Sequence, residues 1–148
     1  MFDSIILNLR KQNPLVHNIT NYVTVNDVAN ILLAVGASPV MTDEAADVKQ
    51  MSAISSAVNI NVGTLNKRTI KSMFLAGKIA NANGRIAVLD PVGAGATDLR
   101  TKTCLNLIKK IHFDVIKGNM SEIKTLASAV CKIQQMEIMK LIRQKALM

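Results

Sequence analysis

The sequence predicts an α/β fold built around a parallel β-sheet. Apolar residues alternate in short stretches and recur at helical spacing in the longer stretches between them. This succession of strands and helices is typical of a parallel sheet with crossover helices. A length of 148 residues is enough for one domain with a substantial core. Because the sequence has no internal repeat, low-complexity tract or linker, we expect a single α/β domain.

The first predicted elements are a helix, an extended segment and a second helix. Residues 23–35 are apolar on one face, and Gly36 is placed to end that helix in the left-handed conformation. Residues 37–41 are predicted to be extended because Pro39 disfavours a helix there. Residues 44–55 return to helical spacing.

The period then changes to that of a strand. Val58, Ile60 and Val62 alternate with Asn59 and Asn61, so the apolar residues share one face of an extended segment. Four further elements complete the alternation of strands and helices. They are a helix at residues 67–82, a strand at 86–89, a helix at 99–111 and a strand at 115–116.

A last helix is predicted from Ser121 to the end of the chain, because no glycine or proline interrupts it. Its apolar stripe is regular as far as Ile133. Beyond that point apolar residues spread around the helix, which is typical of a buried helix.

The net charge of +8 is concentrated in the C-terminal third, where residues 98–148 hold 10 Lys and Arg against 4 Asp and Glu. With one tyrosine, three phenylalanines and no tryptophan, there is little surface on which bases could stack. We therefore expect a solvated basic face or an affinity for anionic ligands, and no nucleic acid partner.

The sequence also predicts a cytoplasmic protein with no membrane partner. It has no apolar stretch of membrane-spanning length, and no positive charge precedes the short apolar run at its N-terminus. The two cysteines, Cys104 and Cys131, lie in predicted helices without metal-site spacing. We expect both to be reduced, buried thiols.

The strongest functional signal lies at the ends of two predicted strands. Asp90 follows one strand and is followed by a turn containing Gly93 and Gly95, while Lys117 and Glu122 follow the next strand. Ligands of open α/β sheets bind at the carboxyl ends of the strands. Carboxylates beside a glycine turn and a lysine therefore indicate a site for phosphates and Mg²⁺, with Asp90 and Glu122 as its ligands, directly or through water.

Each of these residues also has a structural interpretation. Asn119 and Glu122 have the spacing of a helix N-cap with a capping box. Asp90 alone could be a turn residue, and the two glycines alone could form only a tight turn. It is their combination, on consecutive strand ends, that favours function.

The amide-rich segment at residues 17–23, with Asn21 near its centre, leaves two interpretations open. Its polar side chains could satisfy local backbone groups or line a pocket for a small polar heterocycle. We expect His17 to be a hydrogen-bonded structural residue rather than a general base. Met41 could be an ordinary core residue.

Five segments in this order resemble the hydroxyethylthiazole kinase family, within the ribokinase-like superfamily. They are PLVHNITN at residues 14–21, GASPVM at 36–41, NINVGTL at 59–65, LDPVGAGAT at 89–97 and KGNMSE at 117–122.

The resemblance implies a three-layer, parallel-sheet ribokinase-like fold and a homotrimer. It implies Mg²⁺- and ATP-dependent phosphorylation of the alcohol of 4-methyl-5-(2-hydroxyethyl)thiazole, in thiamine salvage. Met41 and Asn21 would bind the thiazole and Lys117 would bind ATP. Asp90 and Glu122 would be the catalytic residues that organise magnesium and phosphates.

The chain also departs from the family. Two later family segments, a Thr/Ser-Gly turn for ATP and a Gly-x-Gly-Cys anion hole, are missing, and neither Cys104 nor Cys131 has glycine neighbours. The resemblance fades after about Ala127, so it implies an N-terminal part of a ribokinase-like kinase domain at residues 1–127 and an atypical helical tail at residues 128–148. We therefore expect a fold that is incomplete at the C-terminus, and little activity from this chain alone. The alternative is a non-catalytic half-domain that associates with a partner chain.

Overall fold

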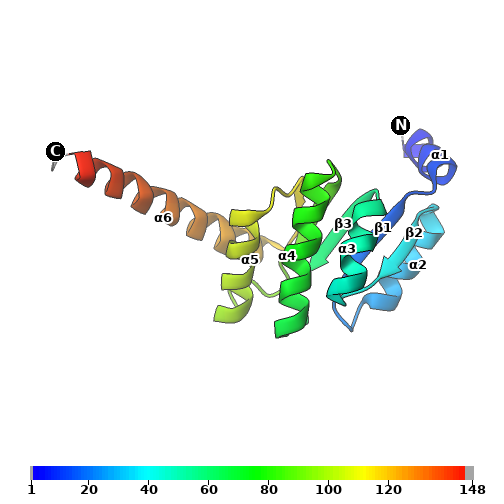
Figure 1. Ribbon diagram of the computed structural model, residues 1–148, viewed down its shortest axis with the longest axis horizontal. Helices are drawn as coiled ribbons and strands as arrows, with labels where there is room; N and C mark the ends of the chain where they lie inside the picture. The colour runs from blue at the N-terminus through cyan, green and yellow to red at the C-terminus, as the bar shows by residue number, and fades with distance from the viewer. Residues whose placement is uncertain (1, 146–148) are drawn as a thin grey trace.

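A five-stranded, fully parallel sheet forms the centre of the protein, with the strand order β2-β1-β3-β4-β5. Figure 1 shows β2, β1 and β3 next to one another in this order. The computed structural model describes residues 2–145, and the surroundings of side chains 3–135. The strands are β1 (Leu15–Ile19), β2 (Ser38–Met41), β3 (Ala57–Asn61), β4 (Ile86–Asp90) and β5 (Val115–Ile116). The helices are α1 (Phe2–Gln12), α2 (Val25–Val35), α3 (Ala45–Ile54), α4 (Lys67–Ala82), α5 (Asp98–Lys110) and α6 (Met120–Lys145).

The two faces of the sheet differ in how well they are covered. On one face, Val58, Ile60 and Leu89 are fully buried beneath α3, α4 and α5. On the other face, α2 packs beside β2, and none of its residues is buried. Ile31 of α2 remains 61% exposed. The second face is therefore open above β3 and β4, next to the ends of these strands.

Local sequence explains where the helices begin and end. The side chain of Asn66 accepts hydrogen bonds from the N–H groups of Arg68 and Thr69, and the Thr69 hydroxyl accepts one from the Asn66 N–H. This capping box begins α4 at Lys67. Gly36 ends α2 with φ of 98°, a left-handed conformation that glycine adopts without a Cβ clash.

The structure confirms the predicted parallel α/β fold, and α4 has the predicted bounds of 67–82. The sequence prediction missed α1 and also β1, which lies inside the sheet between β2 and β3. Cys104 is buried as expected, but the expectation for Cys131 was wrong because its side chain is exposed on α6. Helix α6 runs without interruption through residues 127 and 128.

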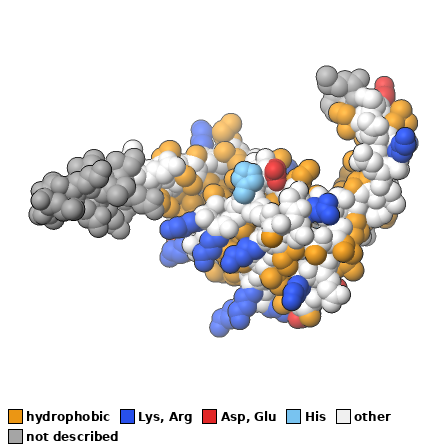
Figure 2. All heavy atoms as spheres, turned by 45° about the horizontal axis from the view of Figure 1, so that its top comes forward, with side chains coloured by type: hydrophobic (Ala, Val, Ile, Leu, Met, Phe, Trp, Pro, Cys, Tyr) orange, Lys and Arg blue, Asp and Glu red, His pale blue; other side chains and the backbone are white. Residues whose placement is uncertain are grey.

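The surface in Figure 2 carries more basic than acidic side chains, in line with the charge of the sequence. Among the described residues, no helix is both long and apolar enough to cross a membrane. The predicted spread of apolar residues over 136–142 lies outside the side chains whose surroundings are described.

Candidate active site

A pocket of about 490 Å³ lies at the carboxyl ends of β1, β3 and β4. Asn21, Asn61, Asp90 and Lys117 line it, together with the first turn of α2. Three residues predicted from the sequence, Asn21, Asp90 and Lys117, therefore meet in one pocket although they are far apart along the chain. Parallel strands bring them together because their carboxyl ends share one edge of the sheet.

A line of side-chain amides crosses this edge of the sheet. Asn21 Nδ2 donates to Asn61 Oδ1 at 3.1 Å, and Asn61 Nδ2 donates to Asp90 Oδ2 at 3.1 Å. Asn61 Oδ1 also accepts from the N–H of Gly63 at 2.8 Å. Asn21 Oδ1 in turn accepts from the N–H groups of Val23 and Thr24, which directly precede α2. Asp90 is thus held in one orientation by β3, and β3 is held by the loop after β1.

The two oxygens of Asp90 have different surroundings. Oδ2 accepts from Asn61 and lies 3.4 Å from Lys117 Nζ, whereas Oδ1 makes no hydrogen bond among the described residues. The Asp90 side chain is 20% exposed and the Lys117 side chain 75% exposed, so the ion pair faces solvent and is weak. One carboxylate oxygen and one mobile ammonium group are therefore available to a ligand.

Glu122 lies behind the glycine turn and is buried. Its Oε1 accepts from the Gly93 N–H at 2.7 Å, and its Oε2 accepts from the Asn119 N–H at 2.8 Å. Asn119 Oδ1 accepts from the Glu122 N–H at 3.0 Å, which completes a capping box at the start of α6. The structural interpretation of Asn119 and Glu122 is confirmed, and the same carboxylate also ties α6 to the turn after β4.

The acidic side chains do not form a preformed metal cage. The described residues contain no group of three or more His, Cys, Asp or Glu side chains that could hold a metal ion. Magnesium usually keeps several waters and is bound through one or two carboxylates together with substrate phosphates. Asp90 Oδ1 fits such a site. Both oxygens of Glu122 already accept from backbone N–H groups, so Glu122 is the less available of the two carboxylates.

Met41 lies in a second pocket of about 220 Å³ beside the first. Thr20 and Thr64 line both pockets and so form the wall between them. The Thr20 hydroxyl is buried and is the only buried side-chain polar atom without a partner among the described residues. The structure thus places Met41 next to the other predicted residues but not in the same pocket.

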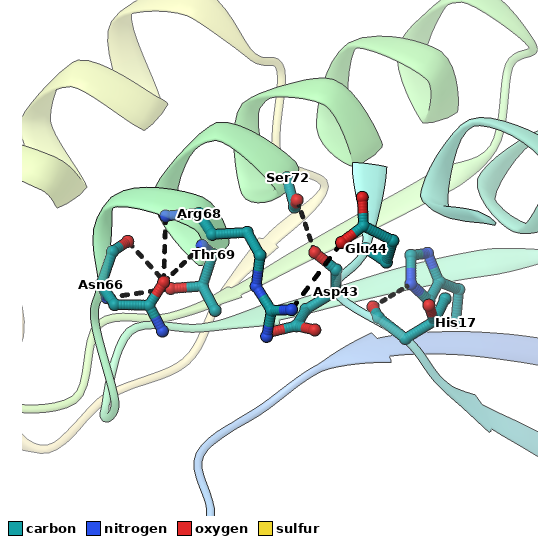
Figure 3. Close-up of polar contacts among 8 residues, drawn as sticks. His17, Asp43, Glu44, Asn66, Arg68, Thr69 and Ser72 are labelled. Atoms are coloured by element: carbon teal, nitrogen blue, oxygen red, sulfur yellow. Dashed lines mark hydrogen bonds and ion pairs between the residues drawn. The ribbon is translucent and has the colours of Figure 1, made fainter. Parts of the chain in front are cut away.

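The loop after β2 forms one side of this second pocket and is fixed from two directions (Figure 3). Arg68 Nη2 of α4 pairs with Asp43 Oδ2 at 3.1 Å, and the Ser72 hydroxyl donates to the Asp43 carbonyl at 2.7 Å. The second contact comes from β1, where His17 Nε2 lies 2.9 Å from the Thr42 carbonyl.

His17 is fully buried and serves as a structural hydrogen-bonding residue, as expected from the sequence. A carbonyl can only accept, so Nε2 carries the proton, and Nδ1 accepts from the Ser52 hydroxyl at 2.9 Å. Burial lowers the pKa of His17, against smaller opposing effects of the Thr42 carbonyl and Asp47. The imidazole therefore stays neutral and joins β1, α3 and the loop after β2.

Cys104 does not supply a reactive thiol to the site. Its side chain is fully buried, and burial, followed by the nearby charge of Glu122, raises its pKa to about 11. A thiol with such a pKa stays protonated near neutral pH.

Sequence reasoning missed Asn61 and Arg68 as residues of the site. Asn59 and Asn61 were identified only as the polar positions of an alternating strand. Their spacing contained the missing signal, because residues two apart on a strand share one face, and amides on the less covered face at a strand end can line a pocket.

The chain is similar to known proteins over most of its length. The model of the hydroxyethylthiazole kinase family matches residues 6–142. The hydroxyethylthiazole kinases of Clostridium tetani and Clostridium acetobutylicum are each 58% identical to the chain, over 122 and 120 residues. These matches cover 82% and 81% of the chain but 44% of each relative. The solved hydroxyethylthiazole kinase protein of Pyrococcus horikoshii OT3 is similar at a TM-score of 0.83 and 44% identity, over 89% of this chain and 52% of that one. The chain thus spans about half the length of these relatives, or less.

Proposed function

Because this chain belongs to the hydroxyethylthiazole kinase family, we propose that its two pockets bind a thiazole alcohol and the phosphate end of ATP. The reaction is transfer of the γ-phosphoryl group to the alcohol of 4-methyl-5-(2-hydroxyethyl)thiazole, in thiamine salvage. The observation that carries this proposal is the position of Asp90. Its carboxylate is oriented by Asn61, has a free oxygen and stands beside Lys117 in the larger pocket.

The smaller pocket is the proposed place of the thiazole ring. It combines the apolar Met41 with the hydroxyl groups of Thr20 and Thr64, a lining that suits a small heterocycle with a polar edge. Asn21, in the adjoining pocket, lies on the side towards Asp90. A substrate whose hydroxyethyl arm passes Thr20 and Thr64 would bring its hydroxyl group into the larger pocket.

The larger pocket is the proposed place of the phosphates. Phosphoryl transfer needs positioned reactants and neutralised charge rather than covalent chemistry by the protein. Magnesium bound to ATP would supply part of that neutralisation, with Asp90 Oδ1 as its protein contact. Lys117 contributes a mobile positive charge. Glu122 acts on the site by holding the Gly93 N–H and the start of α6, and would contact magnesium directly or through water.

The test is calorimetric titration of the chain with the thiazole alcohol and, separately, with Mg-ATP, followed by a kinase assay. The unaltered chain should bind both ligands. Asp90→Asn removes the charge but keeps an acceptor for Asn61, so it should weaken Mg-ATP binding at least tenfold and leave the alcohol unaffected. The matched control is Asp114→Asn, at the opposite end of the sheet. Equal binding of Mg-ATP by Asp90→Asn and the unaltered chain would refute the assignment.

A second candidate function is a non-catalytic half-domain that associates with a partner chain. The observation that favours it is the unpaired edge of the sheet at β5, where Val115 is 48% and Ile116 39% exposed. Apolar residues on an unpaired strand favour pairing with a further strand. If turnover is absent in the chain alone but arises on mixing with the C-terminal half of a related kinase, this function is supported.

Light scattering of the unmixed chain tests the homotrimer that we propose for the kinase.

A further inference from the structure

Arg100, in the first turn of α5, joins two of the loops that surround the site. Its Nη2 donates to the Gly63 carbonyl at 2.9 Å, directly after β3. The other side of its guanidinium lies against Gly93 in the turn after β4, where a Cβ atom would overlap Arg100 Nη1. The guanidinium therefore fills the space between these two strand ends.

This guanidinium has no acidic partner among the described residues. The recorded ion pairs involve Arg68, Lys102, His112 and Lys117, and none involves Arg100. The Arg100 side chain is partly buried and presents five N–H donors in a planar fork, of which only Nη2 has a recorded protein acceptor. The guanidinium is thus held between two strand ends with no carboxylate to neutralise its charge, which leaves it available to an anionic ligand.

The backbone of the glycine turn cannot bind that anion itself. The Gly93 N–H donates to Glu122 and the Gly95 N–H to the Thr101 hydroxyl. The N–H groups of Ala94 and Ala96 donate to carbonyls within the same turn. A glycine turn usually holds phosphate through free backbone N–H groups, but here the donors from Gly93 to Ala96 are already used. The glycine turn from Gly93 to Ala96 therefore offers no free N–H group of its own, and the Arg100 side chain beside it is the candidate for the positive contact.

We propose that the Arg100 guanidinium is the phosphate-binding group of this turn. It would bind two oxygens of a nucleotide's phosphate chain while Nη2 remains on the Gly63 carbonyl. Gly63 lines the larger pocket together with Asp90 and Lys117, so a phosphate chain held by Arg100 would extend towards both. Arginine suits this position because its fork can contact a phosphate and a carbonyl together. The inference rests on the proposed function, since it takes ATP as the ligand.

Calorimetry on Arg100→Gln and Arg100→Lys tests the proposal, with Mg-ATP, tripolyphosphate, adenosine and the thiazole alcohol as ligands. Arg85→Gln is the matched control, because Arg85 is an exposed arginine at the opposite end of β4. Losing a hydrogen-bonded charge contact should weaken Mg-ATP and tripolyphosphate binding by Arg100→Gln roughly 10- to 100-fold. Arg100→Lys should show a smaller loss. Adenosine and alcohol binding should stay unchanged, as should all binding by Arg85→Gln.

The outcomes separate this inference from the function on which it rests. If Arg100→Gln binds Mg-ATP as tightly as the unaltered chain, the inference is overturned and the proposed function stands. If Arg100→Gln loses alcohol and phosphate binding equally, Arg100 only maintains the fold of the loops, and the inference is again overturned. If the unaltered chain binds the alcohol but neither Mg-ATP nor tripolyphosphate, both the inference and the ATP part of the proposed function fail.

Discussion

Replacing Glu122 should destabilise the fold in the complete absence of magnesium. Glu122 was predicted from the sequence as a magnesium residue, and its geometry shows that it also holds two backbone N–H groups. A residue whose only role was to bind magnesium would show no effect of substitution in metal-free buffer. The free energy of unfolding therefore distinguishes the structural role from the metal role.

The size of the effect follows from the two hydrogen bonds, at 2.7 and 2.8 Å, to a carboxylate that is 8% exposed. A hydrogen bond to a charged group contributes about 1.5–3 kcal/mol, so Glu122→Ala should cost about 3–6 kcal/mol. Glu122→Gln keeps one carbonyl oxygen and should cost about half as much. Small domains are stable by about 5–15 kcal/mol, so the Gln variant should stay folded even if the Ala variant does not.

The assay is urea unfolding followed by circular dichroism in buffer with EDTA. Asp98→Ala is the matched control, since Asp98 is also in the first turn of a helix but pairs with Lys102 at the surface. Such a pair between exposed residues on a helix contributes about 0.5 kcal/mol or less. If Glu122→Gln costs no more than Asp98→Ala, the structural role assigned to Glu122 is wrong.

Three further predictions concern the turn, the thiols and the buried imidazole. Gly93→Ala should cost more than the ~1–2 kcal/mol of left-handed strain expected for Gly84→Ala, because the new methyl group must displace the Arg100 guanidinium and with it the hydrogen bond to the Gly63 carbonyl, whereas at Gly84 it meets nothing; equal urea midpoints would contradict this. Ellman's reagent should modify one thiol of the folded chain, the exposed Cys131, and reach the buried Cys104 only in denaturant; two fast-reacting thiols would show that this burial is wrong. Because burial lowers the pKa of His17, the unfolded chain takes up a proton more readily, so stability should fall as the pH drops from about 7.5 through the unfolded pKa of about 6.5. Urea unfolding at pH 7.5 and 5.5 measures this, and His17→Gln should lose less stability over the same interval; an identical loss would exclude His17 as its source.

The fold could be predicted where local sequence and burial agree. Helix α4 carries a regular pattern of apolar and small residues and an asparagine cap, and its predicted bounds match those of the structure. Strand β1 was missed because LVHNI carries His17 and Asn18 inside a central strand. Apart from Asn18 Nδ2, which donates to the nearby Val16 carbonyl, their polar atoms are satisfied by Ser52, Thr42 and Asn59. These partners are distant in sequence, so no local pattern reveals that the segment can be buried.

The candidate site was predictable to the extent that it follows strand ends. Asp90, Lys117 and Asn21 lie together because a parallel sheet aligns the carboxyl ends of its strands. The partner of Glu122 was not predictable, since the Gly93 N–H is 29 residues away and its availability depends on the φ angles of the turn. The role of Asn61 depends in the same way on the pairing of β3 with β4.

The amide line from Asn21 to Asp90 has a consequence for how a ligand would bind. The hydrogen bond from Asn61 fixes the orientation of the Asp90 side chain before any ligand binds. Ordering a free carboxylate on binding costs side-chain entropy, and here that cost is met during folding instead. Substitution of Asn61 should therefore reduce affinity by freeing the Asp90 side chain, beyond the loss of any contact that Asn61 itself makes in the pocket. Ligand binding at this edge of the sheet thus depends on the hydrogen bonds from Asn21 to Asn61 and from Asn61 to Asp90, as well as on direct contacts with the ligand.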